Sequence, residues 1–151
     1  MLASMQSLHT SLPTPETIQV LVVSANRDDF NAASRMLRHG QWRITRASSC
    51  REAIEMMQEN SFAVILCERD LPDGSWRNLA DHVSGSPKPP SLLVMSRYAD
   101  ESLWSEVLNT GGYDVLPKPF DSGEFTRVIG MAWRHSWSTW LRKKDVSSAY
   151  A

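Results

Sequence analysis

The sequence is short of cysteine, of long apolar runs and of excess charge of either sign. Its two cysteines, Cys50 and Cys67, show no CxxC spacing, which excludes a disulfide framework and predicts reduced thiols. The longest apolar run, residues 62–67, falls far short of the roughly 20 residues that cross a bilayer. Sixteen Lys and Arg against seventeen Asp and Glu leave a net charge of −1, which argues against nucleic-acid and membrane-surface proteins. The first residues have no secretory signal, so we expect a soluble, cytoplasmic protein.

Motifs for metal binding and for common catalytic sites are missing as well. The four histidines have no ligand spacing, so no metal site is predicted from them. The sequence also has no glycine-rich phosphate loop and no GxSxG element. Nothing in these patterns indicates an enzyme.

The chain does contain a regular alternation of strand and helix patterns. Apolar or alternating runs predict strands at residues 18–23, 42–47, 62–67, 91–96 and 113–116. This order predicts one α/β domain over residues 18–142, with a doubly wound five-stranded parallel sheet and helices on both faces. Residues 1–17 and 143–151 are interpreted as tails.

Caps, stops and apolar stripes predict the helices between the strands. Gly40 is expected to end the first helix, and Ser49–Glu52 has the pattern of a capping box that opens the second. In the fourth helix, four residues are expected to share one apolar face: Leu103, Trp104, Val107 and Leu108.

The residues that follow the strands are the candidates for a functional site, because the crevice of such sheets lies outside the carboxyl ends of the strands. Two short motifs stand there, Leu71-Pro72-Asp73-Gly74 after the third strand and Lys118-Pro119-Phe120-Asp121 after the fifth. With Ser96 and Gly111-Gly112, they resemble the receiver domain of bacterial response regulators. The resemblance covers about residues 18–142 and implies the CheY-like, flavodoxin-type fold of strand order 2-1-3-4-5.

The resemblance also implies a particular chemistry. In the family, an acidic pair after the first strand and an aspartate after the third hold Mg²⁺, and that aspartate accepts a phosphoryl group from a histidine kinase. A hydroxyl residue and a lysine bind the phosphate oxygens, and an aromatic residue on the fifth strand turns inward. Ser96 and Lys118 match these two catalytic positions, and the Lys118-Pro119 bond is expected to be cis.

Four other positions depart from the family pattern. The acidic pair aligns with Ser24 and Ala25, the phosphoacceptor with Glu68, and the switch aromatic with Val115. Losing two carboxylates removes most of the ligand charge of the cation, and phosphoryl transfer depends on that charge. We therefore expect no Mg²⁺ cofactor, and at most residual Mg²⁺-dependent autophosphorylation. The longer Glu68 side chain is expected to reach Lys118 or Ser96, where a phosphoryl group would otherwise arrive.

Other acids near the crevice have simpler interpretations. Asp70 lies two residues beyond Glu68 and offers an alternative acceptor, but it is interpreted as a solvated loop acid. Asp28 and Asp29 are interpreted as acids at the start of a helix, where the helix dipole favours them.

The last helix, expected from Asp121 to about Arg142, carries tryptophan at i, i+4 and i+7. Trp133 is expected to pack in the core. Trp137 and Trp140 lie beyond the usual length of this helix and predict a surface for self-association or partner docking, because exposed aromatic stripes mark interfaces.

The sequence thus predicts a stand-alone pseudo-receiver in two-component signalling, with no output domain in the nine residues after the last helix. Its partner would be a signalling protein, a histidine kinase or a second copy bound through the last helix. Three alternatives stay open: a receiver phosphorylated on Glu68 or Asp70, a small α/β enzyme that reuses the crevice, and a structural dimerisation module.

Overall fold

The computed structural model describes the chain over residues 17–150, with side chains described for residues 17–142. The predicted N-terminal tail, residues 1–17, lies outside this part apart from Thr17. Within the described part, no helix combines the length and apolar character needed to span a membrane.

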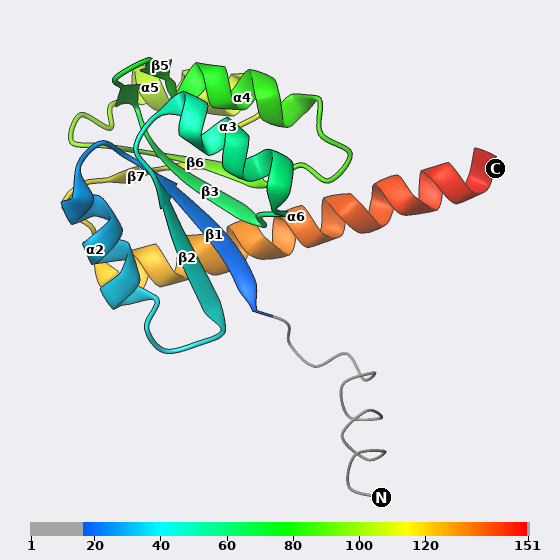
Figure 1. Ribbon diagram of the computed structural model, residues 1–151, viewed down its shortest axis with the longest axis horizontal. Coiled ribbons are helices and arrows are strands. Elements are labelled where there is room, and N and C mark those ends of the chain that lie inside the picture. Colours follow the sequence, from blue (N-terminus) through cyan, green and yellow to red (C-terminus); the bar gives the residue numbers. More distant parts are fainter. Residues whose placement is uncertain (1–16, 151) are drawn as a thin grey trace, which may run out of the picture.

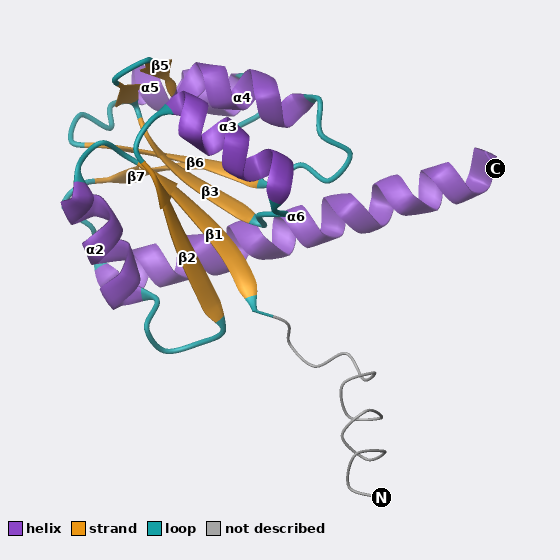
Figure 2. Cartoon of the chain, in the orientation of Figure 1, coloured by secondary structure: helices purple, strands orange, loops and turns teal. Residues whose placement is uncertain are grey.

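A parallel sheet of five strands forms the centre of the molecule (Figures 1 and 2). Its strands are β1 (Ile18–Val23), β2 (Trp42–Ala47), β3 (Val64–Glu68), β6 (Ser91–Ser96) and β7 (Asp114–Pro117). The spatial order is β2-β1-β3-β6-β7, which is 2-1-3-4-5 when only these strands are counted. The predicted fold class and strand order are confirmed.

Helices cover both faces of the sheet. They are α2 (Arg27–Met36), α3 (Cys50–Glu59), α4 (Trp76–Ser84), α5 (Glu101–Asn109) and α6 (Ser122–Tyr150). Figure 1 shows α2 and α6 on one face and α3, α4 and α5 on the other. Alternate residues of each central strand enter the two cores: Leu21 and Ile65 pack with α3 and α4, whereas Val22 and Leu66 pack with α2 and α6. Because both faces are covered, these strands are apolar at most positions.

A small antiparallel hairpin after β3 was not predicted. It pairs β4 (Asp70–Leu71) with β5 (Gly74–Ser75), and Asp73 lies in the turn between them. The Asp73 carboxylate accepts hydrogen bonds from the backbone N–H groups of Cys50, at 2.8 Å, and Arg51, at 3.0 Å. Asp73 therefore caps the start of α3 from a distant loop and fixes the hairpin against that helix.

Several predicted boundaries and faces need correction. Helix α2 ends at Met36 rather than Gly40, and Gly40 lies in the following turn with φ of 145°. On α5, Leu103 and Val107 are buried, whereas Trp104 and Leu108 are 49% and 45% exposed. The indole N–H of Trp104 instead donates to Asp114 at 2.8 Å. The capping box at Ser49–Glu52 is only half formed, because the Glu52 carboxylate accepts from Ser48.

The last helix is longer than predicted. Helix α6 continues to Tyr150 instead of ending near Arg142, so most of the predicted C-terminal tail is helical. No proline or glycine follows Gly130, and no residue type in this stretch strongly opposes a helix. Figure 1 shows the second half of α6 projecting past the sheet.

Candidate functional site

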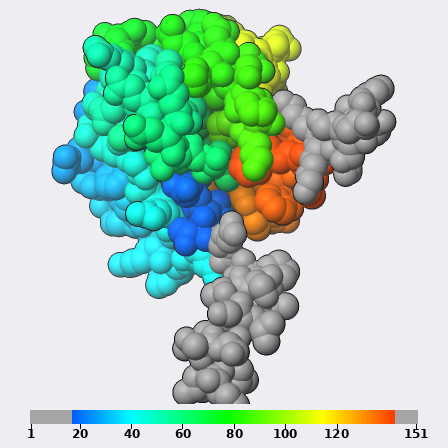
Figure 3. All heavy atoms as spheres, turned by 45° about the vertical axis from the view of Figure 1, so that its right-hand side comes forward, coloured from blue at the N-terminus to red at the C-terminus, as the bar shows by residue number. Residues whose placement is uncertain are grey.

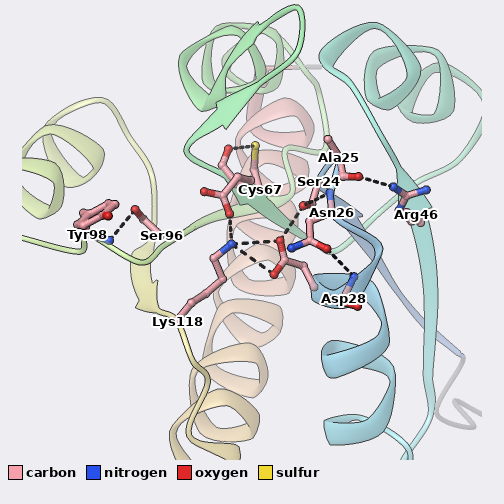
Figure 4. Close-up of polar contacts among 11 residues, drawn as sticks. Ser24, Ala25, Asn26, Asp28, Arg46, Cys67, Ser96, Tyr98 and Lys118 are labelled. Atoms are coloured by element: carbon pink, nitrogen blue, oxygen red, sulfur yellow. Dashed lines mark hydrogen bonds and ion pairs between the residues drawn. The ribbon is translucent and has the colours of Figure 1, made fainter.

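The crevice at the carboxyl ends of the strands has a volume of about 290 Å³. Figure 4 shows its side chains, which come from the ends of β1, β3, β6 and β7 and from the start of α2. Its lining residues are Ser24, Ala25, Asn26, Asp29, Glu68, Arg69, Asp70, Ser96, Arg97, Tyr98 and Lys118. The sheet therefore brings together the predicted positions Ser24, Ala25, Glu68, Ser96 and Lys118.

Lys118 lies between two carboxylates. Its Nζ donates to Oε2 of Glu68 and to both carboxylate oxygens of Asp29, at 3.2 and 3.3 Å (Figure 4). The three side chains are largely withdrawn from solvent, with exposed fractions of 13% for Lys118, 8% for Asp29 and 22% for Glu68. Glu68 was expected to reach Lys118 or Ser96, and in the structure its partner is Lys118.

The position of Asp29 corrects the interpretation of this residue as an ordinary acid of a helix start. It does lie in the first turn of α2, but it is 6% exposed and its carboxylate enters the crevice. The Ser24 hydroxyl donates to Oδ2 of Asp29 at 2.7 Å and accepts from the backbone N–H of Asn26 at 3.0 Å. Ser24, at an acidic-pair position, thus orients a carboxylate supplied by the helix. Asp28 lies in the first turn of α2, as predicted, and is exposed.

This arrangement differs from the ligand set that Mg²⁺ takes. A divalent cation bound to protein carboxylates needs those oxygens free to coordinate it. Here both nearby carboxylates already contact an ammonium group, and positions 24 and 25 carry a hydroxyl and a methyl group. Within the described residues, no group of three or more His, Cys, Asp or Glu side chains is placed to hold a metal ion.

The hydroxyl position lines the crevice without bonding to Lys118 or Glu68, and the aromatic position lies in the core. Ser96 is 3% exposed, and its Oγ accepts from the backbone N–H of Tyr98 at 3.0 Å. Val115, at the switch position, is 6% exposed in the core, and the ring of Tyr113 stacks against His135 at 5.0 Å between centroids. The Lys118-Pro119 bond is cis, as predicted.

Arg46 lies beside the crevice, and no sequence pattern pointed to it. It lies near the end of β2, and one guanidinium NH₂ donates to the carbonyl oxygen of Ala25 at 3.0 Å (Figure 4). The bond ties the loop after β1 to the edge strand. Only the pairing of β1 with β2, which places the ends of these two strands side by side, could have pointed to Arg46.

Both cysteine thiols are buried and free. Burial, and next the negative charge of Asp73, raises the pKa of Cys50 to about 11. Burial also raises the pKa of Cys67 well above its usual value. The hydrogen bonds from the backbone of Arg51 and Cys50 lower the pKa of Asp73, because they stabilise its charged form.

The tryptophans of α6 differ in exposure. Trp133 is half-buried and contacts Trp42 edge to face, with centroids 6.5 Å apart. Trp140 is also half-buried: its indole N–H donates to the carbonyl of Pro89 at 2.8 Å, so this residue packs on the loop before β6 instead of standing free. Trp137 is 54% exposed and lies 6.3 Å from the Trp140 ring.

This fold and crevice define the class of protein. A 2-1-3-4-5 parallel sheet with a lysine and cis-proline after the edge strand, and an acid after the central strand, is the architecture of a signalling receiver domain. The sequence matches the family model described as "Response regulator receiver domain" over residues 20–130. The chain belongs to this family.

Curated proteins and solved structures agree with that assignment. The chain is 25% identical over 125 residues to the transcriptional regulatory protein ZraR of Escherichia coli (strain K12), covering 83% of this chain and 28% of ZraR. The beryllofluoride-activated NtrC4 receiver domain dimer is 26% identical, with a TM-score of 0.71 over 78% of this chain and 98% of that one. A CheY-like receiver domain protein from Methanospirillum hungatei JF-1 has a TM-score of 0.72 at 16% identity, covering 82% and 99%. The chain spans little more than a quarter of the length of ZraR.

Proposed function

We propose that this receiver domain works in two-component signalling through protein contacts that do not depend on phosphorylation of an aspartate. The observation that carries the proposal is the pairing of Lys118 with both Asp29 and Glu68. Lys118 then serves as the internal counter-ion of the crevice, in the place where the family uses a cation.

The charges support this assignment. The carboxylates of Asp29 and Glu68 and the ammonium group of Lys118 together carry a net charge of −1, and Lys118 forms an ion pair with each carboxylate. Binding Mg²⁺ would require these contacts to be exchanged for coordination bonds, and the cation would gain no carboxylate from positions 24 and 25. Because phosphoryl transfer rests on positioning and charge neutralisation, little of it survives without the cation.

The alternative acceptors are less well placed. The Glu68 carboxylate is already bound to Lys118. Asp70 is exposed on the short strand β4, where its carboxylate lies 3.9 Å from Nε of Arg69. Neither acid is grouped with others that could hold Mg²⁺ among the described residues.

A titration with Mg²⁺, followed by beryllofluoride as a mimic of the acyl phosphate, tests the proposal. Amide NMR spectra should show no saturable shifts at Glu68, Ser96 or Lys118 in either step. The matched control is the triple variant Ser24→Asp, Ala25→Asp and Glu68→Asp, which supplies the family's three carboxylates and should bind the cation. Saturable shifts in the parent chain would overturn the proposal.

We also assign the contact with a signalling partner, a histidine kinase or a second copy to α6. Trp137 supports this, because a tryptophan 54% exposed on a long helix is suited to an interface. NtrC4, a relative by structure, forms a receiver dimer. Light scattering of Trp137→Ala should show lost self-association, with Trp104→Ala on α5 as the exposed control; equal effects of both variants would remove the assignment to α6.

A further inference from the structure

A second surface, distant from the crevice, is apolar and is only partly covered by the described residues. It consists of five side chains of β2 and α6, named here the tryptophan face: Trp42, Trp133, Trp137, Trp140 and Leu141. Ring contacts connect four of them in two pairs, at 6.5 and 6.3 Å between centroids. Trp137 is 54% exposed and Leu141 is 47% exposed. A contiguous apolar surface of this kind indicates a contact site.

The chain enters the domain beside this face. β1 begins at Ile18, which pairs in register with Trp42 of β2. Trp42 in turn contacts Trp133 of α6. Figures 1 and 3 both show the start of β1 next to the middle of α6. The point at which the chain enters β1 therefore lies on the same side of the molecule as the tryptophan face.

The sequence of that preceding segment matches the face. Residues 1–12 contain no Asp, Glu, Lys or Arg. Apolar residues recur at intervals of four, three and four positions, at Met1, Met5, Leu8 and Leu12. This spacing is typical of one apolar side on a helix, and the positions between carry mainly Ser, Thr and Gln.

The connection is long enough. From Trp133 to Leu141 the axis of α6 advances about 12 Å, at about 1.5 Å per residue. The five residues 13–17 between the segment and β1 span up to about 17 Å when extended. Pro13 and Pro15 favour such an extended connection.

We propose that residues 1–12 cover the tryptophan face of their own chain, with Leu8 and Leu12 against Trp137 and Leu141. A partner or second copy that binds α6 would contact the same side chains as this segment. This contact within one chain is independent of the state of the crevice.

Paramagnetic broadening tests the contact in the full chain. A spin label is attached at Thr10→Cys, on the polar side of the segment. Cys50 and Cys67 are 5% and 0% exposed, and the parent chain treated with the same reagent controls for their labelling. The indole N–H signal of Trp137 is identified with Trp137→Phe. It should disappear in the labelled chain at every protein concentration, whereas that of Trp76, buried under α4 on the opposite face, should remain.

Matched variants show which side chains make the contact. Leu8→Asn with Leu12→Asn should restore the Trp137 signal, and Ser7→Asn with Ser11→Asn should not. A Trp137 signal that is never broadened, or that stays broadened without Leu8 and Leu12, would overturn the proposal. The proposal would also be overturned if the Trp137 signal is broadened only when spin-labelled chains are mixed with unlabelled, isotope-enriched chains. The contact would then join two copies of the chain. That last outcome leaves the proposed interface of α6 intact.

Discussion

Replacing Lys118 with methionine removes the internal cation and keeps a side chain of similar length. The Asp29 and Glu68 carboxylates then face each other, 8% and 22% exposed, with no positive partner. Removing one partner of a buried ion pair costs about 3–5 kcal/mol, and the lower end applies here because Glu68 can turn partly to solvent. The free energy of unfolding should therefore fall by about 3 kcal/mol.

Urea unfolding followed by far-ultraviolet circular dichroism measures this loss. With a slope of about 2 kcal/mol per molar urea, the midpoint should fall by about 1.5 M. The control is Arg51→Met, which removes an ion pair with Glu55 whose side chains are 86% and 62% exposed, and which should leave the midpoint unchanged. Adding Asp29→Asn to Lys118→Met should recover part of the loss, because one uncompensated carboxylate disappears.

The same variant exposes a latent cation site. With the ammonium group gone, Mg²⁺ can compensate the two carboxylates, and a ligand that binds only the folded state stabilises it. Mg²⁺ should therefore raise the urea midpoint of Lys118→Met and leave that of the parent chain unchanged. Equal midpoints for the parent and Lys118→Met, or equal stabilisation of both by Mg²⁺, would refute the view of Lys118 as an internal counter-ion.

Three further predictions concern other parts of the molecule. Asp73→Ala should lower the urea midpoint at neutral pH. Because the folded pKa of Asp73 lies below its unfolded value, the stability that its carboxylate contributes is full above about pH 4 and is lost as the pH falls through the folded pKa. The difference in urea midpoint between the parent and Asp73→Ala should therefore disappear in acid. Cys50 and Cys67 should resist alkylation in the folded chain at neutral pH, since the pKa of Cys50 is about 11 and that of Cys67 is also raised. Mass spectrometry should show modification of these thiols only in denaturant. Trp140→Ala should destabilise the fold by about 2 kcal/mol in thermal unfolding, roughly half the cost for a fully buried tryptophan.

Much of the fold could be predicted because its signals are local. Residues 20–23 and 92–95 are apolar on consecutive positions, which is typical of strands covered on both faces. The Leu71-Pro72-Asp73-Gly74 and Lys118-Pro119 motifs follow their strands in the expected places. Helix α6 exceeded its predicted length because no residue after Gly130 gives a stop signal. The hairpin β4–β5 was missed because two-residue strands are too short to leave a pattern.

The candidate site was predicted only where strand ends supply its residues. The contact of Glu68 with Lys118 followed from their places after β3 and β7. Asp29 was missed because an acid in the first turn of a helix has the same local signal whether it faces solvent or a lysine 89 positions away. The partner of Trp140, the Pro89 carbonyl, lies 51 positions distant and was equally hidden. Contacts of this kind depend on how the elements pack, which no local spacing records.

Treatment with a small phosphodonor in the presence of Mg²⁺ is the most direct test of the central proposal. Intact-mass spectrometry under denaturing conditions would follow the parent chain beside the variant that carries Ser24→Asp, Ala25→Asp and Glu68→Asp. The account predicts that the parent keeps its mass, while the variant gains the mass of one phosphoryl group that is lost again in base, as an acyl phosphate is. A base-labile phosphoryl group on the parent chain, removed by Glu68→Gln or Asp70→Asn, would contradict the account and establish a working phosphorylation site.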